Sequence, residues 1–215
     1  GLDTIARRFP GIDHILADGE RLPAIDFCAN LMSLPLAFGT TVATIPAEVP
    51  YLSPDPAYLA KWAPRFADRS RPRVGLAWAG RPTHRSDRLR SMHIDQLASI
   101  LDVEGVRFVS LQKGPAAAQA EAVPERIDWD GIGAELDDLD DAAAVLSGLD
   151  LLIAVDTGLA HLAGAMGKPV WVMLQTPSEY RWMTGREDTP WYPTMRLFRQ
   201  DTPRAWGAVV ARVAE

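Results

Sequence analysis

The sequence is poor in cysteine and in positive charge, and it has no long apolar run. Its 215 residues contain one cysteine, Cys28, so no disulfide can form within the chain, which fits a reducing compartment. Cys28 itself is expected to be a small buried hydrophobe. The formal net charge of −6 argues against a nucleic-acid partner, because a phosphate backbone is bound by a basic face. No run approaches the roughly 18 apolar residues of a membrane span, and no basic-then-apolar leader opens the chain. These absences predict a soluble cytoplasmic protein without a transmembrane segment.

Several chemical signatures are missing as well. The chain contains neither a G-x-G-x-x-G dinucleotide fingerprint nor a G-x-x-x-x-G-K-[ST] phosphate loop, which weighs against NAD and against ATP hydrolysis. It also lacks Cys/His sets with zinc spacing and a G-x-S-x-G elbow. Asp138 and Asp140 form a D-x-D pattern, but they stand at the start of a predicted helix, where acids cap the helix and its dipole favours anions. We therefore expect no metal and no cofactor.

The chain divides into an irregular part and a regular part. Residues 1–56 contain short apolar pieces between seven prolines, which is typical of extended chain and turns. Strands are predicted at residues 74–79, 106–111, 127–129, 151–155, 170–174 and 195–198. Helices are predicted at residues 57–67, 94–101, 119–123, 139–146, 158–166 and 205–214. Continuous apolar strands that alternate with helices predict an α/β fold, a Rossmann-like parallel sheet with helices on both faces, over residues 71–215.

The polar segment DTGLAH, residues 156–161, stands between a predicted strand and a predicted helix. Ligands bind at the carboxyl ends of parallel strands, and the first amides of the next helix favour an anion. We expect free N–H groups on Gly158, Leu159 and Ala160. Thr157 and His161 are four residues apart and share a helix face, which predicts a phosphate site. In the alternative, Asp156 or Thr157 is only the N-cap, and His161 is a partly buried histidine bonded to a carbonyl.

Two further strand ends fall on the same rim of the predicted sheet. Residues 80–91, GRPTHRSDRLRS, are strongly basic in an acidic protein, and arginine forks suit phosphate oxygens. The side chains expected to bind there are Arg81, His84, Arg85 and Arg88. A solvated basic loop is the alternative, and Ser91 or Asp95 is expected to cap the helix that follows. Gln112 and Lys113 follow the next predicted strand.

Longer segments resemble a known family. AVDTGLAHLAGAMGKPVWVML and EYRWMTGREDTPWYPTMRLFRQ resemble the carboxyl-terminal domain of glycosyltransferase family 9, the heptosyltransferase-like proteins. The resemblance is strongest to bacterial proteins in which that domain follows tetratricopeptide repeats. VGLAWAGRPTHRSDRLRS is similar to the first loop of the domain, and LMSLPLAFGTTVATIPAEVPYL to the segment that joins its two halves. The resemblance implies the donor-binding half of a GT-B fold, in which two Rossmann-like domains face each other.

The resemblance also implies roles for particular residues. Residues 157–160 with His161 would hold the diphosphate of a nucleotide-sugar donor, and Asp156 would lie near the sugar, which makes Asp156 and His161 the candidate catalytic residues. The loop that begins at Gly80 would close over the phosphates. Gln112 and Lys113 would approach the base or ribose. Residues 181–192 would flank the donor, with Trp182 and Trp191 either at the donor or in the core.

Family members carry a full amino-terminal domain, whereas this sequence begins in what resembles the last third of one. We expect residues 1–70 to be a remnant of that acceptor-side domain with a linker. The remnant should pack on the core and expose an apolar face that permits a homodimer. The leading hypothesis is a donor domain that binds a nucleoside-diphosphate sugar for transfer to a hydroxyl acceptor. The alternatives are a non-catalytic nucleotide- or protein-binding module, and an epimerase of the same architecture.

Overall fold

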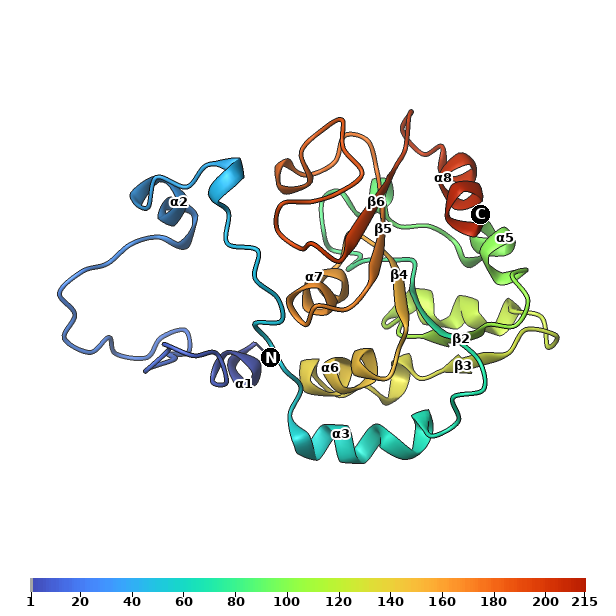
Figure 1. The fold of residues 1–215 in the computed structure, drawn as a ribbon, viewed down its shortest axis with the longest axis horizontal. Coiled ribbons are helices and arrows are strands. Elements are labelled where there is room, and N and C mark those ends of the chain that lie inside the picture. The colour runs from blue at the N-terminus through green and yellow to red at the C-terminus, as the bar shows by residue number, and fades with distance from the viewer. Residues whose placement is uncertain (1) are drawn as a thin grey trace.

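Six parallel strands form one sheet in the computed structural model, which describes residues 2–215 (Figure 1). The strands run in the order β3-β2-β1-β4-β5-β6. Their bounds are β1 Arg73–Ala77, β2 Arg107–Ser110, β3 Trp129–Gly131, β4 Leu151–Val155, β5 Val170–Leu174 and β6 Met195–Arg199. Every neighbouring pair is parallel, and the order reverses between β1 and β4. This is the doubly wound arrangement, so the predicted Rossmann-like α/β class is confirmed.

Helices cover both faces of the sheet (Figure 1). On one face lie α6 (Leu139–Ser147) and α7 (Gly158–Ala165), with α3 (Pro56–Trp62) packed against α6. On the other face lie α5 (Ala98–Leu101) and α8 (Trp206–Ala214). Successive strand side chains point to opposite faces, so the core has two apolar clusters, with Leu76 in one and Ala77 in the other. Trp62 and Phe66 belong to the apolar cluster on the α6–α7 face, so the end of segment 1–70 packs on the core.

Short helical turns occupy the connections. After residue 62 these turns are α4 (Asp87–Arg90) and the 3₁₀ helices η3 (Ala63–Phe66), η4 (Ile94–Leu97), η5 (Pro115–Ala122), η6 (Gly133–Glu135) and η7 (Tyr180–Trp182). The helix predicted at residues 94–101 is η4 continued by α5. Its cap was predicted wrongly: His93 accepts from the Asp95 N–H at 3.5 Å, while Gln96 accepts from the His93 N–H at 2.9 Å. Ser91 instead accepts the N–H of Gly80 at 2.9 Å and so closes the loop after β1.

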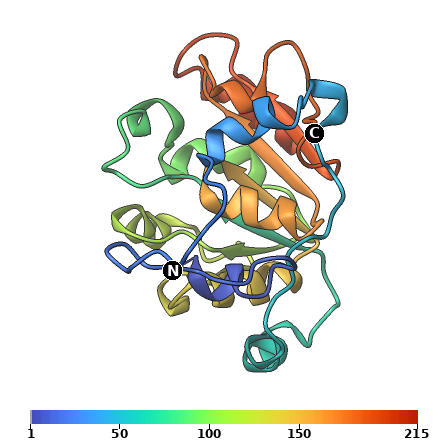
Figure 2. The same ribbon diagram turned by 90° about the vertical axis from the view of Figure 1, so that its left-hand side faces the viewer.

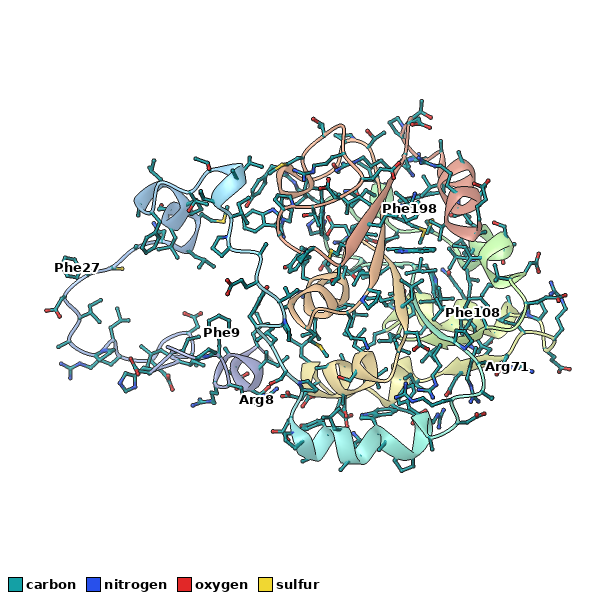
Figure 3. All side chains as sticks on the ribbon, in the orientation of Figure 1. Arg8, Phe9, Phe27, Arg71, Phe108 and Phe198 are labelled. Atoms are coloured by element: carbon teal, nitrogen blue, oxygen red, sulfur yellow. The ribbon has the colours of Figure 1, made fainter. Side chains whose placement is uncertain are left out.

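Residues 2–48, which we call the N-terminal arm, extend away from the sheet (Figures 1 and 2). The arm carries α1 (Asp3–Ala6), η1 (Leu31–Ser33), α2 (Leu34–Ala37) and η2 (Val42–Thr44). Ile5 is buried in the α6–α7 cluster, and Arg8 pairs with Asp140 of α6. Most of the arm is exposed, so the expectation that it packs on the core is wrong beyond these contacts. Cys28 is exposed too, which corrects its expected burial; Figure 3 shows the neighbouring Phe27 at the outer end of the arm.

The helices of the structure are short. Within residues 2–215, none combines the length and the apolar character needed to cross a lipid bilayer.

Candidate functional site

Two cavities open at the carboxyl ends of β1 and β4, where the strand order reverses. The smaller, about 190 Å³, is called the charged pocket here and is lined by His84, Arg90, Asp156, Thr157, Gly158, His161, Gln175, Glu179 and Arg181. The larger, about 550 Å³, is called the apolar cavity, and its lining includes Ala77, Leu111, Leu136, Leu139, Ala142 and Leu159. Thr157 and Gly158 line both, so the two cavities meet at the start of α7. A switch point of this kind is where doubly wound sheets bind ligands.

The first turn of α7 leaves polar groups without partners. Thr157 is the N-cap residue in an extended conformation, and its buried Oγ1 has no hydrogen-bond partner among residues 2–215. Gly158 has open space where a Cβ would stand, so a ligand can approach the backbone there. No acceptor within the described chain takes up the N–H of Gly158 or Leu159. Ala160 N, however, donates to Thr157 O at 3.1 Å, so the predicted free amide of Ala160 is wrong.

Asp156 and His161 face each other across this turn. Nε2 of His161 lies 3.6 Å from Oδ1 of Asp156, and its ring stacks on Trp182 with the centroids 5.1 Å apart. Burial by itself raises the pKa of Asp156, but His161, Trp182 and Arg181 outweigh it and hold that pKa below its usual value. Asp156 is therefore the ionised partner of His161. It does not cap the helix, which was one of the two open interpretations.

A second contact fixes the other side of the imidazole ring. Nδ1 of His161 lies 3.2 Å from the hydroxyl of Tyr192. Burial raises the pKa of Tyr192, and hydrogen bonding to Tyr51 raises it further. Tyr51 joins the core through its backbone N–H, which donates to Ala165 O at 2.9 Å. Asp156, His161, Tyr192 and Tyr51 thus form a chain of polar contacts from the charged pocket to the segment that follows the N-terminal arm.

Two arginines border His161 and Asp156. Arg181, which precedes Trp182 in η7, places Nη1 3.5 Å from Nε2 of His161 and pairs with Glu179 at 2.8 Å. Arg90, the last residue of α4, donates from Nη1 to the carbonyl oxygen of Asp156 at 2.8 Å. A Cβ on Gly80 would collide with the Arg90 guanidinium, so a larger residue there would require that side chain to shift.

The predicted basic loop divides between the two cavities. His84 lines the charged pocket, whereas Gly80 and Arg81 line the apolar cavity. Arg85 and Arg88 are exposed and line neither cavity. Their predicted phosphate contacts remain predictions.

Gln112 and Lys113 line the apolar cavity as expected from their place after β2. The Gln112 carboxamide is fully used by the backbone, since Oε1 accepts from Trp78 N and Ala79 N at 3.0 and 2.9 Å, and Nε2 donates to Ala79 O at 3.1 Å. Gln112 therefore holds the ends of β1 and β2 together. Nζ of Lys113 donates a hydrogen bond to the carbonyl oxygen of Leu136 at the cavity wall.

The D-x-D acids have structural partners. Asp138 caps α6, and its Oδ1 accepts the N–H groups of Asp140 and Asp141 at 2.9 Å each, which confirms the capping interpretation. Asp140 pairs with Arg8. Asp141, fully buried, accepts from Lys61 and from the indole of Trp62 at 2.7 Å. Within residues 2–215 no group of three or more His, Cys, Asp or Glu side chains is arranged to hold a metal ion.

Trp182 and Trp191, predicted to lie either at the donor or in the core, have different roles. Trp182 is fully buried, yet it forms the wall on which His161 stacks, so it is core and site together. Its Nε1 has no hydrogen-bond partner in the described part of the chain, although it lies near enough to Asp156 to lower the pKa of that carboxyl. Trp191 is half-buried, and its Nε1 donates to Arg181 O at 3.0 Å. Trp191 therefore positions the segment that carries Arg181.

Several site residues were not singled out from the sequence. Gln175 lines the charged pocket because it directly follows β5, and the rule that placed Asp156 after β4 applies to it equally. Arg90 was counted only as part of the basic loop, because its contact with Asp156 O joins residues 66 positions apart. Tyr51 carried no sequence signal, because it reaches Tyr192 only in the folded chain.

Comparisons with known proteins show which family the sequence matches. Residues 66–203 match glycosyltransferase family 9 (heptosyltransferase). The chain is 30% identical over 202 residues to Protein FlbA of Caulobacter vibrioides, covering 91% of this chain and 33% of that protein. It thus spans about one third of the length of this curated relative.

Two solved structures share the fold. One is the E. coli ADP-heptose lps heptosyltransferase II, with a TM-score of 0.51 and 17% identity over 80% of this chain and 57% of that one. The other is a glycosyl transferase family 9 protein from Veillonella parvula, with a TM-score of 0.50 and 14% identity over 69% of this chain and 42% of that one. At such identities the likeness concerns the arrangement of the sheet and its helices.

Proposed function

The chain belongs to glycosyltransferase family 9. We propose that it binds a nucleoside-diphosphate sugar, from which the sugar is transferred to a hydroxyl acceptor. The observation that carries the proposal is the meeting of two unlike cavities at the start of α7. Backbone amides at a helix start bind phosphate oxygens, and those of Gly158 and Leu159 are available for one. The diphosphate therefore bridges the two cavities at Thr157 and Gly158.

The nucleoside occupies the apolar cavity. Its volume of about 550 Å³ lies within the range of small-molecule sites, roughly 300–1,000 Å³. Leu111, Leu136 and Leu159 offer an apolar surface for a flat base, and Arg81 and Lys113 stand at the same cavity to meet polar groups. Gln112 contributes by holding the cavity wall in shape, because its carboxamide is bonded to the backbone.

In transfer, the protein stabilises the diphosphate as it departs. The amides of α7, with His161 and the guanidinium groups of Arg90 and Arg181, are fixed dipoles and charges aimed at the leaving group. We propose that no metal ion takes part. The acids closest in pattern to a metal site, Asp138 and Asp140, are engaged by helix amides and by Arg8. Binding of a nucleoside diphosphate should then survive an excess of chelator.

The experiment is a thermal-shift and calorimetry series with ADP, GDP and UDP, followed by turnover assays with the matching nucleotide sugars. A ligand at 100 times its dissociation constant should stabilise the chain by about 2.7 kcal/mol. If none of the three nucleotides shifts the unfolding temperature or gives binding heat, the proposal is wrong. Restoration of lost binding by magnesium alone would overturn the metal-independent part.

The exposed N-terminal arm favours a second candidate, a binding module without chemistry. Proximity of two substrates supplies a large part of a transferase's acceleration, and the two cavities described here account for the donor alone. Binding of a nucleoside diphosphate without glycoside formation, in the presence of a panel of hydroxyl acceptors, would support this candidate. Release of a free sugar or its epimer would support an epimerase instead.

A further inference from the structure

Gln175 is the first residue after β5, and its side chain lines the charged pocket. Only 5% of Gln175 is exposed, and its buried Oε1 has no hydrogen-bond partner anywhere in residues 2–215. A buried polar atom without a partner costs about 1–3 kcal/mol, so native proteins pair such atoms unless a ligand does it for them. Other buried atoms of the described chain lack partners too, among them Nε2 of Gln200, but Gln175 differs because it lines the charged pocket, where a ligand could supply the missing hydrogen bond.

The charges around the pocket indicate what kind of group this is. Its two guanidinium groups, Arg90 and Arg181, are matched by two carboxylates, Asp156 and Glu179. Because these charges balance, the pocket suits a neutral group with many hydroxyls beside the diphosphate at the start of α7. Such hydroxyls can donate to the carboxylates and accept from the arginines. Thr157 adds a second buried oxygen without a partner in the described chain, and it stands where the pocket meets the diphosphate position.

We propose that the charged pocket receives the glycosyl group of the donor and that Gln175 hydrogen-bonds one of its hydroxyls, which makes Gln175 a specificity-determining residue. This inference rests on the proposed function, because the diphosphate at the start of α7 delivers the sugar into the pocket. A glutamine carboxamide both accepts and donates, so it suits a hydroxyl, which does the same.

A neighbouring glutamine offers a comparison, because its carboxamide oxygen is bonded to the backbone although its buried Nε2, like Oε1 of Gln175, has no partner in the described chain. Gln200, the first residue after β6, is equally buried, but its Oε1 accepts from Thr176 N at 3.3 Å and from Arg204 N at 3.1 Å. Its carboxamide ties two backbone segments together, and it does not line the charged pocket. Gln175 is equally buried, but its carboxamide oxygen has no such bonds in the described chain and it lines the pocket.

The test compares Gln175→Met with Gln200→Met, because methionine matches the length of glutamine without its hydrogen bonds. Calorimetry on the 215-residue chain measures three ligand pairs: ADP and ADP-glucose, GDP and GDP-mannose, and UDP and UDP-glucose. Each pair differs only by the sugar. The informative pair is the one in which wild type binds the nucleotide sugar more tightly than the diphosphate. For that pair, Gln175→Met should weaken the affinity for the nucleotide sugar about 3- to 10-fold and leave the affinity for the diphosphate unchanged. Gln200→Met should not change the ratio between the two.

Thermal unfolding without ligand gives an independent reading. Gln175→Met removes an unpaired buried oxygen and should keep or raise the unfolding temperature, while Gln200→Met removes two backbone bonds and should lower it. Three results would overturn the role of Gln175: an equal change in affinity for both members of the pair, no change for either, or a lowered unfolding temperature. In each case, nucleotide binding by wild type would still support the proposed function. Absence of any nucleotide binding by wild type would overturn both.

Discussion

At the scale of single residues, His161 has neighbours that make opposite demands on Nε2. The ionised Asp156 can only accept a hydrogen bond, and Arg181 can only donate one. A neutral imidazole can satisfy only one of these two neighbours at Nε2: it donates to Asp156 when Nε2 carries the proton, or accepts from Arg181 when it does not. The hydroxyl of Tyr192 at Nδ1 permits either form, because it can accept or donate. A phosphate oxygen near Nε2 acts as an acceptor and favours the form with a proton there. The residues around His161 thus prepare it to donate.

The first prediction concerns His161→Gln. If Nε2 donates to a diphosphate, this variant should weaken nucleoside-diphosphate binding by about 1.5–3 kcal/mol, the range for hydrogen bonds to charged groups. The stacking on Trp182 means that truncation to alanine would also destabilise the fold, so glutamine is the better replacement. Calorimetry measures the affinity, with His14→Gln on the exposed arm as the matched control. An unchanged affinity would make His161 a structural residue only.

A second prediction follows from the lowered pKa of Asp156. In the unfolded chain the pKa of an aspartate is about 3.9. In the fold, burial by itself raises the pKa of Asp156, but His161, Trp182 and Arg181 stabilise the charged carboxylate more strongly, so the pKa is lowered. Its contribution to stability is therefore present above the unfolded pKa and is lost as the pH falls through the folded one.

Denaturation of wild type and Asp156→Asn between pH 3 and pH 7 tests this. The difference in unfolding free energy should be constant above about pH 5 and shrink below about pH 4. Asp13→Asn, on the exposed arm, is the matched control. A difference that grows on acidification would contradict the sign of the shift.

At the scale of elements, the sequence predicted the buried strands best. β4 and β5 begin and end where the apolar runs at residues 151–155 and 170–174 do, because strands covered on both faces have no polar positions to blur their ends. The start of α7 was placed correctly for a related reason, since Gly158 follows such a run. The short turns α4 and η7 have no periodicity to detect, and they bring Arg90 and Arg181 to the site. The rim could therefore be predicted, but the side chains that complete the charged pocket could not.

The contact between Tyr192 and His161 joins the segment before β6 to α7, and it gives a third prediction. Tyr192→Phe removes the hydroxyl that fixes Nδ1, so it should weaken nucleoside-diphosphate binding about 2- to 10-fold. Because the hydroxyl acts through His161, the same change in a His161→Gln background should cause no further loss. A double-mutant cycle by calorimetry measures the coupling.

Tyr58→Phe is the control for this cycle. It removes a hydroxyl bonded to Asp138 at 2.9 Å, outside the His161 contacts, and should show no coupling with His161→Gln. Strict additivity of Tyr192→Phe and His161→Gln would mean that the hydroxyl of Tyr192 does not position the imidazole.

The loop after β1 supplies a fourth prediction. Gly80→Ala places a methyl group against the Arg90 guanidinium, so the arginine must leave the carbonyl of Asp156 or the loop must shift. Because the guanidinium is the far end of a flexible side chain, it can move at small cost, so we expect a loss of stability below about 1 kcal/mol by chemical denaturation but weaker binding of a nucleoside diphosphate by calorimetry. Gly207→Ala in α8 is the control, because open space surrounds that position and alanine favours a helix. Unchanged nucleotide affinity of Gly80→Ala would show that the position of Arg90 does not matter for binding.

At the scale of the whole molecule, the core and the N-terminal arm behave differently. The core buries two apolar clusters on either side of the sheet, and its fold class could be predicted because strand and helix patterns agreed along the chain. The arm contains enough apolar residues to suggest burial, but its prolines divide them into pieces too short to form one continuous face. Its path therefore could not be predicted from the sequence. Ile5 and Arg8 of the arm contact the core, and the segment around Tyr51 and Leu52, which follows the arm, joins it.

The last prediction is that the isolated chain self-associates through this arm. Large apolar side chains are exposed along it, with Phe27 at 95%, Leu36 at 87% and Phe38 at 80% of their full exposure. Apolar groups this exposed are stabilised by burial against another surface, and in a solution of the pure chain the available surface is a second arm. Sedimentation velocity should show a weight-average mass that rises with concentration.

Replacement of Phe27, Leu36 and Phe38 together by serine should return the chain to a monomer without changing nucleotide affinity, because the core and the two cavities lie outside the arm. The matched control replaces three exposed polar residues of the arm, Asp13, His14 and Asp18, by serine and should leave the association intact. A chain that stays monomeric over the whole concentration range would mean that the arm's apolar side chains do not drive pairing between copies. An association that persists in the triple variant would place the contact elsewhere, on the surface of the core.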